Sequence, residues 1–146
     1  MNEAEVNPTP LLAPAGGVPK IIESADEFEL ALSKLSKSNG PIAVDAERAS
    51  GHRYSARAYL IQLKREKEIF LIDPIAFSNP QNSQLIGKLN EIIQSAEVIL
   101  HASTQDLPCI RDWGLEPKLL FDTELGARLA GLPKVGLGAL CEHFFN

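Results

Sequence analysis

Pro41-Ile-Ala-Val-Asp45 decides the fold of this 146-residue chain, because a short continuous apolar run of this kind is typical of a buried strand. Tyr59-Leu-Ile-Gln-Leu63 and Ile69-Phe-Leu-Ile72 predict a second and a third strand. The charged residues 64–68 between these two predict a turn, so the pair is expected to form a hairpin. Three consecutive strands indicate an antiparallel meander.

Helices and strands alternate on either side of the meander. Ile21 and Ile22 predict a short edge strand, and Ser24 begins a capping box, closed by Glu27, at the start of a helix that runs to about Lys37. Downstream, apolar spacing predicts a helix at 85–93, a strand at 98–101, a short helix at 105–113, a strand at 119–121, and helices at 125–129 and 137–145. Strands that alternate with helices join a sheet in parallel. We therefore expect an α/β fold, with a mixed sheet of three antiparallel strands plus two parallel additions, flanked by helices.

The N-terminal residues differ in composition from the rest of the chain. Residues 1–19 are rich in proline, alanine and glycine and lack hydrophobic periodicity, which is typical of a disordered leader. Residues 20–146 have the length of one domain. The expected organisation is a leader followed by a single domain.

The charge argues against electrostatic binding of nucleic acid by the whole chain, since the formal net charge is −5 and the pI is about 5.2. One stretch is nevertheless basic, and only Glu66 interrupts it. It contains Arg48, Arg53, Arg57, Lys64, Arg65 and Lys67. Two interpretations are open: a surface that faces phosphates, or a solvated hairpin whose lysines protect a sheet edge.

Cysteine content and hydropathy indicate the compartment. Cys109 and Cys141 both lie in apolar helical stretches and are interpreted as buried thiols, so no disulfide is expected. No apolar run approaches the roughly 20 residues that span a bilayer, and the N-terminus lacks the basic region of a signal peptide. We expect a cytoplasmic, monomeric protein with no membrane association.

Three carboxylates are candidate metal ligands. Asp45 and Glu47 lie two residues apart at the end of a strand, so both side chains project from one face of the sheet. Asp106 follows the predicted strand at 98–101, and if that strand lies beside the one at 41–45, Asp106 comes close to the other two. Hard oxygen ligands suit Mg²⁺ or Mn²⁺, and two such ions can catalyse phosphodiester hydrolysis. The alternative is that these are exposed acids, with Asp106 complementing a helix dipole.

Other residues give weaker signals. His101 is interpreted first as a structural histidine at a strand end and second as part of the site. The cysteines and histidines lack zinc-ligand spacing. A phosphate-cradling glycine loop and a nucleophile elbow are also lacking.

Several segments together resemble the ribonuclease D family of the DEDD exonuclease superfamily. Val44-Asp-Ala-Glu-Arg48 with Tyr59-Leu-Ile-Gln-Leu63 resembles its first motif, and Leu100-His-Ala-Ser-Thr-Gln-Asp-Leu107 resembles its second. The run that follows the second motif is matched by Phe121-Asp-Thr-Glu-Leu125, Ala130-Gly-Leu132 and Val135-Gly-Leu-Gly-Ala-Leu140. The resemblance extends from about Ile21 to Phe145.

The resemblance implies a ribonuclease H-like fold and 3′→5′ removal of nucleotides from RNA 3′ ends, tRNA precursors above all. It implies two divalent metal ions, Mg²⁺ or Mn²⁺, with Asp45 and Glu47 as first-motif ligands and Asp106 as the second-motif ligand. The same three carboxylates would be the catalytic groups. Nucleic-acid contacts are expected at Arg48, Arg53, Arg57 and His101.

The chain departs from the family at the third motif, Tyr-x-x-x-Asp, which lies on a later helix. Its two tyrosines, Tyr54 and Tyr59, are followed four residues on by Ala58 and Leu63. We therefore expect 20–146 to be a partial exonuclease domain without the C-terminal helix, with little or no turnover. The alternative hypothesis is a non-catalytic module on a degenerate nuclease fold that binds nucleic acid or acts as a scaffold. A third, a Mg²⁺-dependent phosphotransferase, lacks a nucleotide-binding loop.

Overall fold

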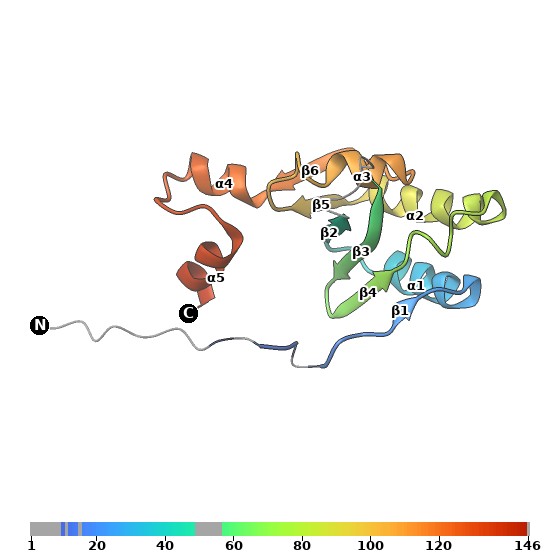
Figure 1. The fold of residues 1–146 in the computed structure, drawn as a ribbon. Coiled ribbons are helices and arrows are strands. Elements are labelled where there is room, and N and C mark those ends of the chain that lie inside the picture. The colour runs from blue at the N-terminus through green and yellow to red at the C-terminus, as the bar shows by residue number, and fades with distance from the viewer. Residues whose placement is uncertain (1–9, 11, 15, 49–56, 146) are drawn as a thin grey trace, which may run out of the picture.

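The computed structural model describes residues 10, 12–14, 16–48 and 57–145. Three consecutive strands are followed by helices and strands that alternate, and two helices end the chain, as Figure 1 shows. The elements are β1 (Ile21–Ile22), α1 (Ala25–Lys37), β2 (Ile42–Arg48), β3 (Ala58–Arg65), β4 (Glu68–Ile72), a 3₁₀ turn η1 (Pro80–Asn82), α2 (Ser83–Ser95), β5 (Glu97–Leu100), α3 (Leu107–Asp112), β6 (Leu119–Asp122), α4 (Thr123–Leu129) and α5 (Leu137–Phe145).

The described strands form one sheet in the order β1-β4-β3-β2-β5-β6. β2, β3 and β4 pair antiparallel, which confirms the predicted meander. β5 joins β2 in parallel and β6 joins β5 in parallel, as predicted from the alternation with helices. The edge strand predicted at Ile21 and Ile22 is β1, which pairs in parallel with β4 and makes a sixth strand.

The meander is longer than the apolar pattern predicted. β2 continues past Asp45 to Arg48, because Glu47 pairs with Leu60 of β3. The register shifts after Glu47, so that Arg48 lies opposite Ala58. The hairpin turn is shorter than the predicted 64–68, with Arg65 opposite Glu68 in the strands. Charged side chains were predicted to mark a loop, but the exposed sides of strands accept them equally well.

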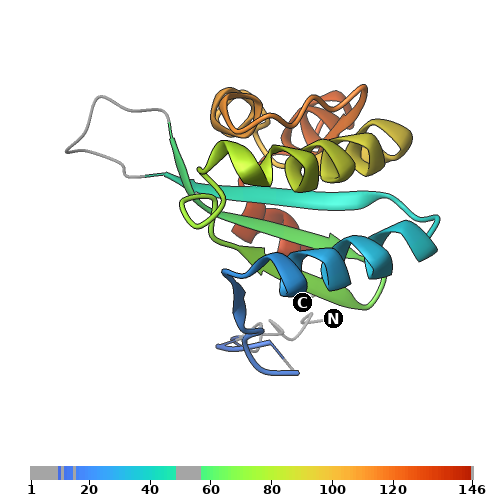
Figure 2. The same ribbon diagram turned by 90° about the vertical axis from the view of Figure 1, so that its right-hand side faces the viewer.

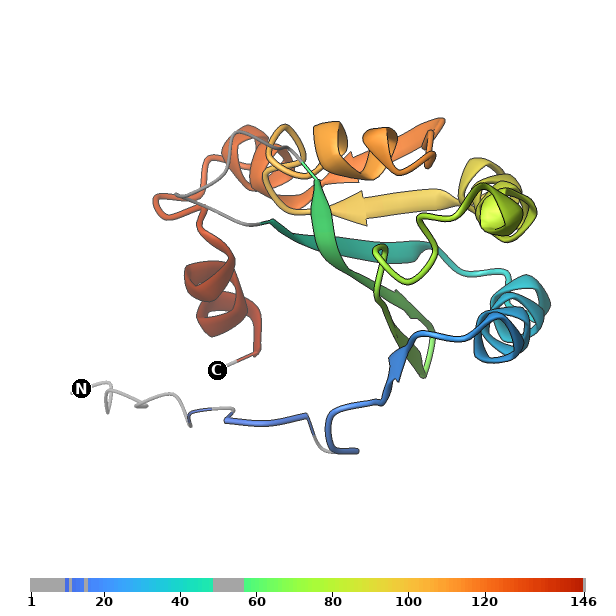
Figure 3. The ribbon, with the colours of Figure 1, turned by 45° about the vertical axis from the view of Figure 1, so that its right-hand side comes forward.

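Helices α1, α2 and α3 pack on one face of the sheet and build the core. Ile42, Val44 and Ala46 point from β2 into that core. Phe28 of α1 lies edge-on to Phe77 at 4.8 Å between ring centroids. Figures 2 and 3 show α1 and α2 side by side along this face. The N-cap half of the capping box predicted for α1 is present, since the Glu27 N–H donates to Ser24 Oγ. The Glu27 carboxylate accepts from the Ser24 hydroxyl and from the N–H of the preceding Glu23.

Arg65 is buried, with 6% of its surface exposed. Its guanidinium donates to the carbonyls of Leu35 (2.7 Å) and Gly40 (2.8 Å), where α1 ends and the chain enters β2. A cation at this position satisfies carbonyl groups that the helix leaves unpaired and complements its dipole. Arg65 therefore has a structural role, and the interpretation of the whole basic stretch as a phosphate-facing surface was wrong for this residue.

The opposite face of the sheet is covered differently. Helix α5 lies on that side, and Figure 3 shows it across from β2 and β3. Large apolar side chains remain exposed on β6, α4 and α5. They are Leu119, Leu120, Phe121, Leu125, Leu129, Leu137, Phe144 and Phe145. Apolar surface therefore stays exposed over β6, α4 and α5.

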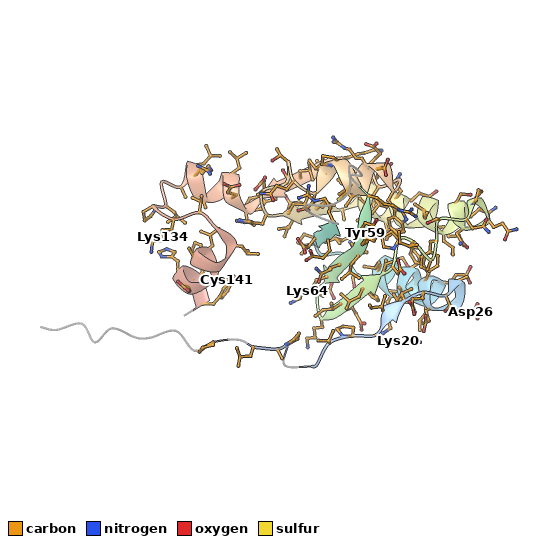
Figure 4. All side chains as sticks on the ribbon, viewed as in Figure 1. Lys20, Asp26, Tyr59, Lys64, Lys134 and Cys141 are labelled. Carbon is orange, nitrogen blue, oxygen red and sulfur yellow. The ribbon has the colours of Figure 1, made fainter. Side chains whose placement is uncertain are left out.

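Two further expectations concern the cysteines and the leader. Cys109 is fully buried, but Cys141 is exposed on α5, so its interpretation as a buried thiol was wrong (Figure 4). Helix α5 buries only Leu140, which leaves its other faces open.

Of the predicted leader, residues 1–9, 11 and 15 lie outside the described residues, and the rest forms neither helix nor strand. Among the described helices, none has the length and apolar character needed to cross a bilayer.

Candidate metal centre

Strand β2 places Asp45 and Glu47 on the same face. The strand alternates between buried Val44 and Ala46 and exposed Asp45 and Glu47, which is the pattern of a strand with one face on the core. The apolar residues fix the register, since a slip of one residue would bury both acids. The sequence argument for two carboxylates on one side of the sheet is thereby confirmed.

Strand β5 brings the second motif to the same place. It pairs in parallel with β2, with Ile42 opposite Val98 and Ala43 opposite Ile99. Parallel neighbours end at the same edge of the sheet, so the loop after β5 lies beside the end of β2. Asp106 ends this loop as the residue before α3, and only 7% of its surface is exposed.

A cavity of about 310 Å³ collects these side chains. Asp45, Glu47 and Asp106 all line it, together with Arg48, His101, Ala102 and Gln105. Ala46 and Leu137 complete the described wall. Residues about 60 positions apart in the chain therefore face one cavity through the parallel pairing of β2 and β5.

The electrostatics of the cavity are those of crowded acids. Burial raises the pKa of Asp106, the negative charge of Asp45 raises it further, the positive charge of Arg48 lowers it, and Glu47 raises it again. The Asp106 carboxylate accepts no capping hydrogen bond at the start of α3. A buried carboxylate with acidic neighbours is destabilised when ionised, and a cation in the cavity would relieve this.

Gln62 is a residue of the site that the sequence analysis did not single out. It lies on β3 directly opposite Asp45, and its amide donates to Asp45 Oδ2 at 2.8 Å. Cross-strand neighbours on one face are close enough for such contacts. The pairing of the two strands was predicted, but their register, which sets Gln62 opposite Asp45, was not.

Asp122 is a second such residue. It ends β6, and its carboxylate accepts from the backbone N–H groups of Glu124 and Leu125 at the start of α4. It also accepts from the N–H groups of Ala102 and Ser103 in the loop after β5. Burial raises the pKa of Asp122, but hydrogen bonds from Ser103, Leu125 and Glu124 outweigh it and lower the pKa to about 2.

The four residues expected to contact nucleic acid are placed differently from one another. Arg48 and His101 line the carboxylate cavity. The His101 ring has a structural partner as well, since Nδ1 lies 2.9 Å from Thr123 Oγ1. Arg57 donates to the Ser78 hydroxyl and lines a separate cavity. Arg53 lies outside the described residues.

The donor set fits a hard divalent ion, because three carboxylates and no thiolate face the cavity. The buried Asp106 carboxylate makes no capping hydrogen bond, which also suits a metal ligand. The three carboxylates are not close enough together to form a ready-made set of ligands. In the described part of the chain, no three His, Cys, Asp or Glu side chains form a group that could hold a metal ion.

Comparison with known proteins identifies the family. Residues 19–146 match the family model described as 3′-5′ exonuclease. The chain belongs to this family. It is a 3′-5′ exonuclease domain of the ribonuclease D and Rrp6 type, and the family generally uses divalent metal ions. The ribonuclease H-like fold implied by the sequence is confirmed, with a six-stranded mixed sheet flanked by helices.

Three similar proteins illustrate the relationship. The exosome complex exonuclease RRP6 of Saccharomyces cerevisiae is 30% identical over 88% of this chain and 17% of its own length. A protein from Bifidobacterium adolescentis has a solved structure with a TM-score of 0.84 and 44% identity, over 92% of this chain and 32% of the other. Escherichia coli RNase D, described as an exoribonuclease involved in structured RNA processing, gives a TM-score of 0.73 at 25% identity over 86% and 33%. This exonuclease domain thus spans a third or less of the proteins named.

Proposed function

We propose that this domain hydrolyses phosphodiester bonds at RNA 3′ ends with divalent metal ions held by Asp45, Glu47 and Asp106. The observation that supports the proposal is the shared cavity, which three carboxylates from two distant segments line. The ribonuclease D and exosome relatives act as exoribonucleases, which makes RNA the substrate we infer for this chain. Structured RNA, including tRNA precursors, is the class we expect.

Each residue has a defined role in this proposal. Asp45 and Glu47 present oxygens from β2, and Asp106 presents its carboxylate from the start of α3. Gln62 orients Asp45 by its hydrogen bond. Metal ions bound there supply an activated water and stabilise the leaving 3′ oxygen. Arg48 lines the same cavity, and we expect it to bind a phosphate of the substrate.

We expect the 146 residues by themselves to bind metal and to turn over RNA weakly. The sequence contains no Tyr-x-x-x-Asp segment, so the ligand and the water-positioning tyrosine that the family resemblance implies are not supplied by these residues. Loss of even an outer-shell partner typically lowers metal affinity or activity about 10–100-fold. We expect the domain to act as a monomer.

The test is Mn²⁺ titration by calorimetry, with Asp45→Ala as the metal-site variant and Asp26→Ala as the matched control. Asp26 is an exposed aspartate in the first turn of α1 and does not line the cavity. The proposal expects saturable Mn²⁺ binding by the wild-type chain and by Asp26→Ala, and its loss in Asp45→Ala. Equal binding by all three proteins would contradict the site assignment.

The substrate is tested separately with a 3′-labelled RNA in Mn²⁺ and a DNA of the same sequence. Slow, metal-dependent release of single nucleotides from RNA, abolished by Asp45→Ala, supports the exoribonuclease. RNA binding without any release, unchanged by Asp45→Ala, supports the non-catalytic module instead.

A further inference from the structure

The loop that carries Asp106 is held by contacts outside α3. Helix α3 has only six residues, and Asp106 precedes it without a side-chain cap. Within the loop, Ala102 has φ 53°, a left-handed conformation that is strained for a residue with a side chain. A strained loop keeps one conformation only where its surroundings fix it. The contacts that fix this loop therefore determine where the Asp106 carboxylate lies.

The Asp122 carboxylate makes the strongest of these contacts. Its Oδ2 accepts from the Ser103 N–H at 2.8 Å, and its Oδ1 accepts from the Ala102 N–H at 3.1 Å. Two successive backbone N–H groups next to a left-handed residue form a concave anion-binding surface. Here Asp122, 20 residues further along the chain, occupies that surface.

A short path of hydrogen bonds leads from Asp122 to Asp106. The Ser103 residue that donates to Asp122 also accepts, through its carbonyl, from the Asp106 N–H at 3.2 Å. The neighbouring Thr123 adds a tether, because its hydroxyl donates to the Leu100 carbonyl at 3.3 Å, just before the loop. The end of β6 thus fixes both the start and the middle of the loop.

We propose that Asp122 is a positioning residue that fixes the Asp106 carboxylate in the metal site through the backbone of Ser103. The inference rests on the proposed function, since it takes Asp106 to be a metal ligand. Asp122 itself does not line the cavity, so it acts through the loop and not as a further ligand. The simpler alternative is that Asp122 only caps α4. Its carboxylate also accepts hydrogen bonds from the N–H groups of Glu124 and Leu125 in the first turn of that helix.

The variant Asp122→Ser separates the two roles. Serine caps a helix about as well as aspartate, so α4 keeps its N-cap. Its single hydroxyl is shorter and cannot also accept from Ala102 and Ser103. The positioning role predicts that Mn²⁺ affinity, measured by calorimetry on the chain well below its melting temperature, falls about 10-fold. Amide signals of Ala102 and Ser103 should shift in the same variant.

Two controls complete the experiment. Ser24→Ala removes the N-cap of α1, far from the loop, and is expected to lower the melting temperature without changing Mn²⁺ affinity. Should Asp122→Ser not fold, Thr123→Val removes the second tether and is expected to weaken Mn²⁺ binding as well. Wild-type affinity in folded Asp122→Ser, or in Thr123→Val where that variant replaces it, overturns the inference.

The failure of this inference differs from failure of the proposed function. A wild-type chain that binds no Mn²⁺ overturns the metal site, and the positioning role falls with it. A wild-type chain whose binding is lost in Asp45→Ala but unchanged in Asp122→Ser keeps the metal site and overturns the positioning role alone.

Discussion

Replacing Asp106 by asparagine should stabilise the metal-free chain. Asp106 is 7% exposed, makes no capping hydrogen bond, and faces Asp45 and Glu47 across the cavity. Its raised pKa means that the folded chain holds the Asp106 proton more tightly than the unfolded chain does. Ionisation at neutral pH therefore opposes folding, and the neutral amide removes this cost.

The magnitude follows from burial. Desolvating a polar group costs about 1–3 kcal/mol and a charged group more, and the neutral asparagine amide keeps only part of that cost. Arg48 already offsets part of the repulsion. We expect a net gain of about 1 kcal/mol for Asp106→Asn at pH 7, or about 3 °C in melting temperature for a chain of this length.

The pH dependence gives a second check on the same variant. Below the unfolded value of 3.8, Asp106 is protonated in both states of the wild-type chain, so the advantage of Asp106→Asn should be absent. It should grow as the pH rises from 3.8 to the raised folded pKa and then stay constant. Urea unfolding in EDTA at several pH values measures this difference.

Metal should reverse the order of stability. At 100 times its dissociation constant a ligand adds about 2.7 kcal/mol to the stability of a protein that binds it. Saturating Mn²⁺ should thus make wild type more stable than Asp106→Asn. Asp45→Asn, at an exposed position of the same cavity, should change metal-free stability by no more than about 0.5 kcal/mol. A metal-free Asp106→Asn chain that is less stable than wild type at pH 7 would refute the account of a desolvated Asp106 carboxylate crowded by other acids.

Three further outcomes are expected. Gln62→Leu removes the hydrogen bond to Asp45 Oδ2 and should weaken Mn²⁺ binding about 10-fold in calorimetry, while the chain stays folded. Arg65→Met removes the hydrogen bonds to the Leu35 and Gly40 carbonyls and should cost about 2 kcal/mol in urea unfolding, without changing the Mn²⁺ affinity of the folded fraction. The folded pKa of Asp122 is lowered to about 2, so its contribution to stability is present above its unfolded value of 3.8 and is lost as the pH falls towards 2. The difference in unfolding free energy between wild type and Asp122→Ala should therefore shrink over that window.

The sequence predicts what is local and periodic. The apolar run before Asp45 predicted β2, and alternation along that strand predicted that Asp45 and Glu47 share a face. The order of strands and helices predicted that β5 joins the sheet in parallel, and the structure adds that its neighbour is β2, the condition under which Asp106 comes close to Asp45 and Glu47. These predictions succeed because each depends on one segment or on the pairing of neighbours.

Predictions failed where the deciding partner lies elsewhere in the chain. Arg65 is indistinguishable in sequence from a solvated hairpin residue. It is buried because the carbonyls of Leu35 and Gly40, at and after the end of α1, accept hydrogen bonds from its guanidinium. Cys141 lies in an apolar helical stretch like Cys109, but α5 has little against which to bury that face. Propensity and composition contain no information on these tertiary partners.

Asp122 shows the same limit at the candidate site. As a single residue it fits an ordinary N-cap, since an aspartate before a helix needs no other explanation. Its contacts with Ala102 and Ser103 exist only because β6 lies beside β5 in parallel, with Leu100 opposite Asp122. The parallel order β2-β5-β6 thus aligns three strand ends: the first presents two carboxylates, the second leads to the loop with Asp106, and the third holds that loop. Because of this sheet order, the candidate ligands and the residue that holds their loop come from three neighbouring strands.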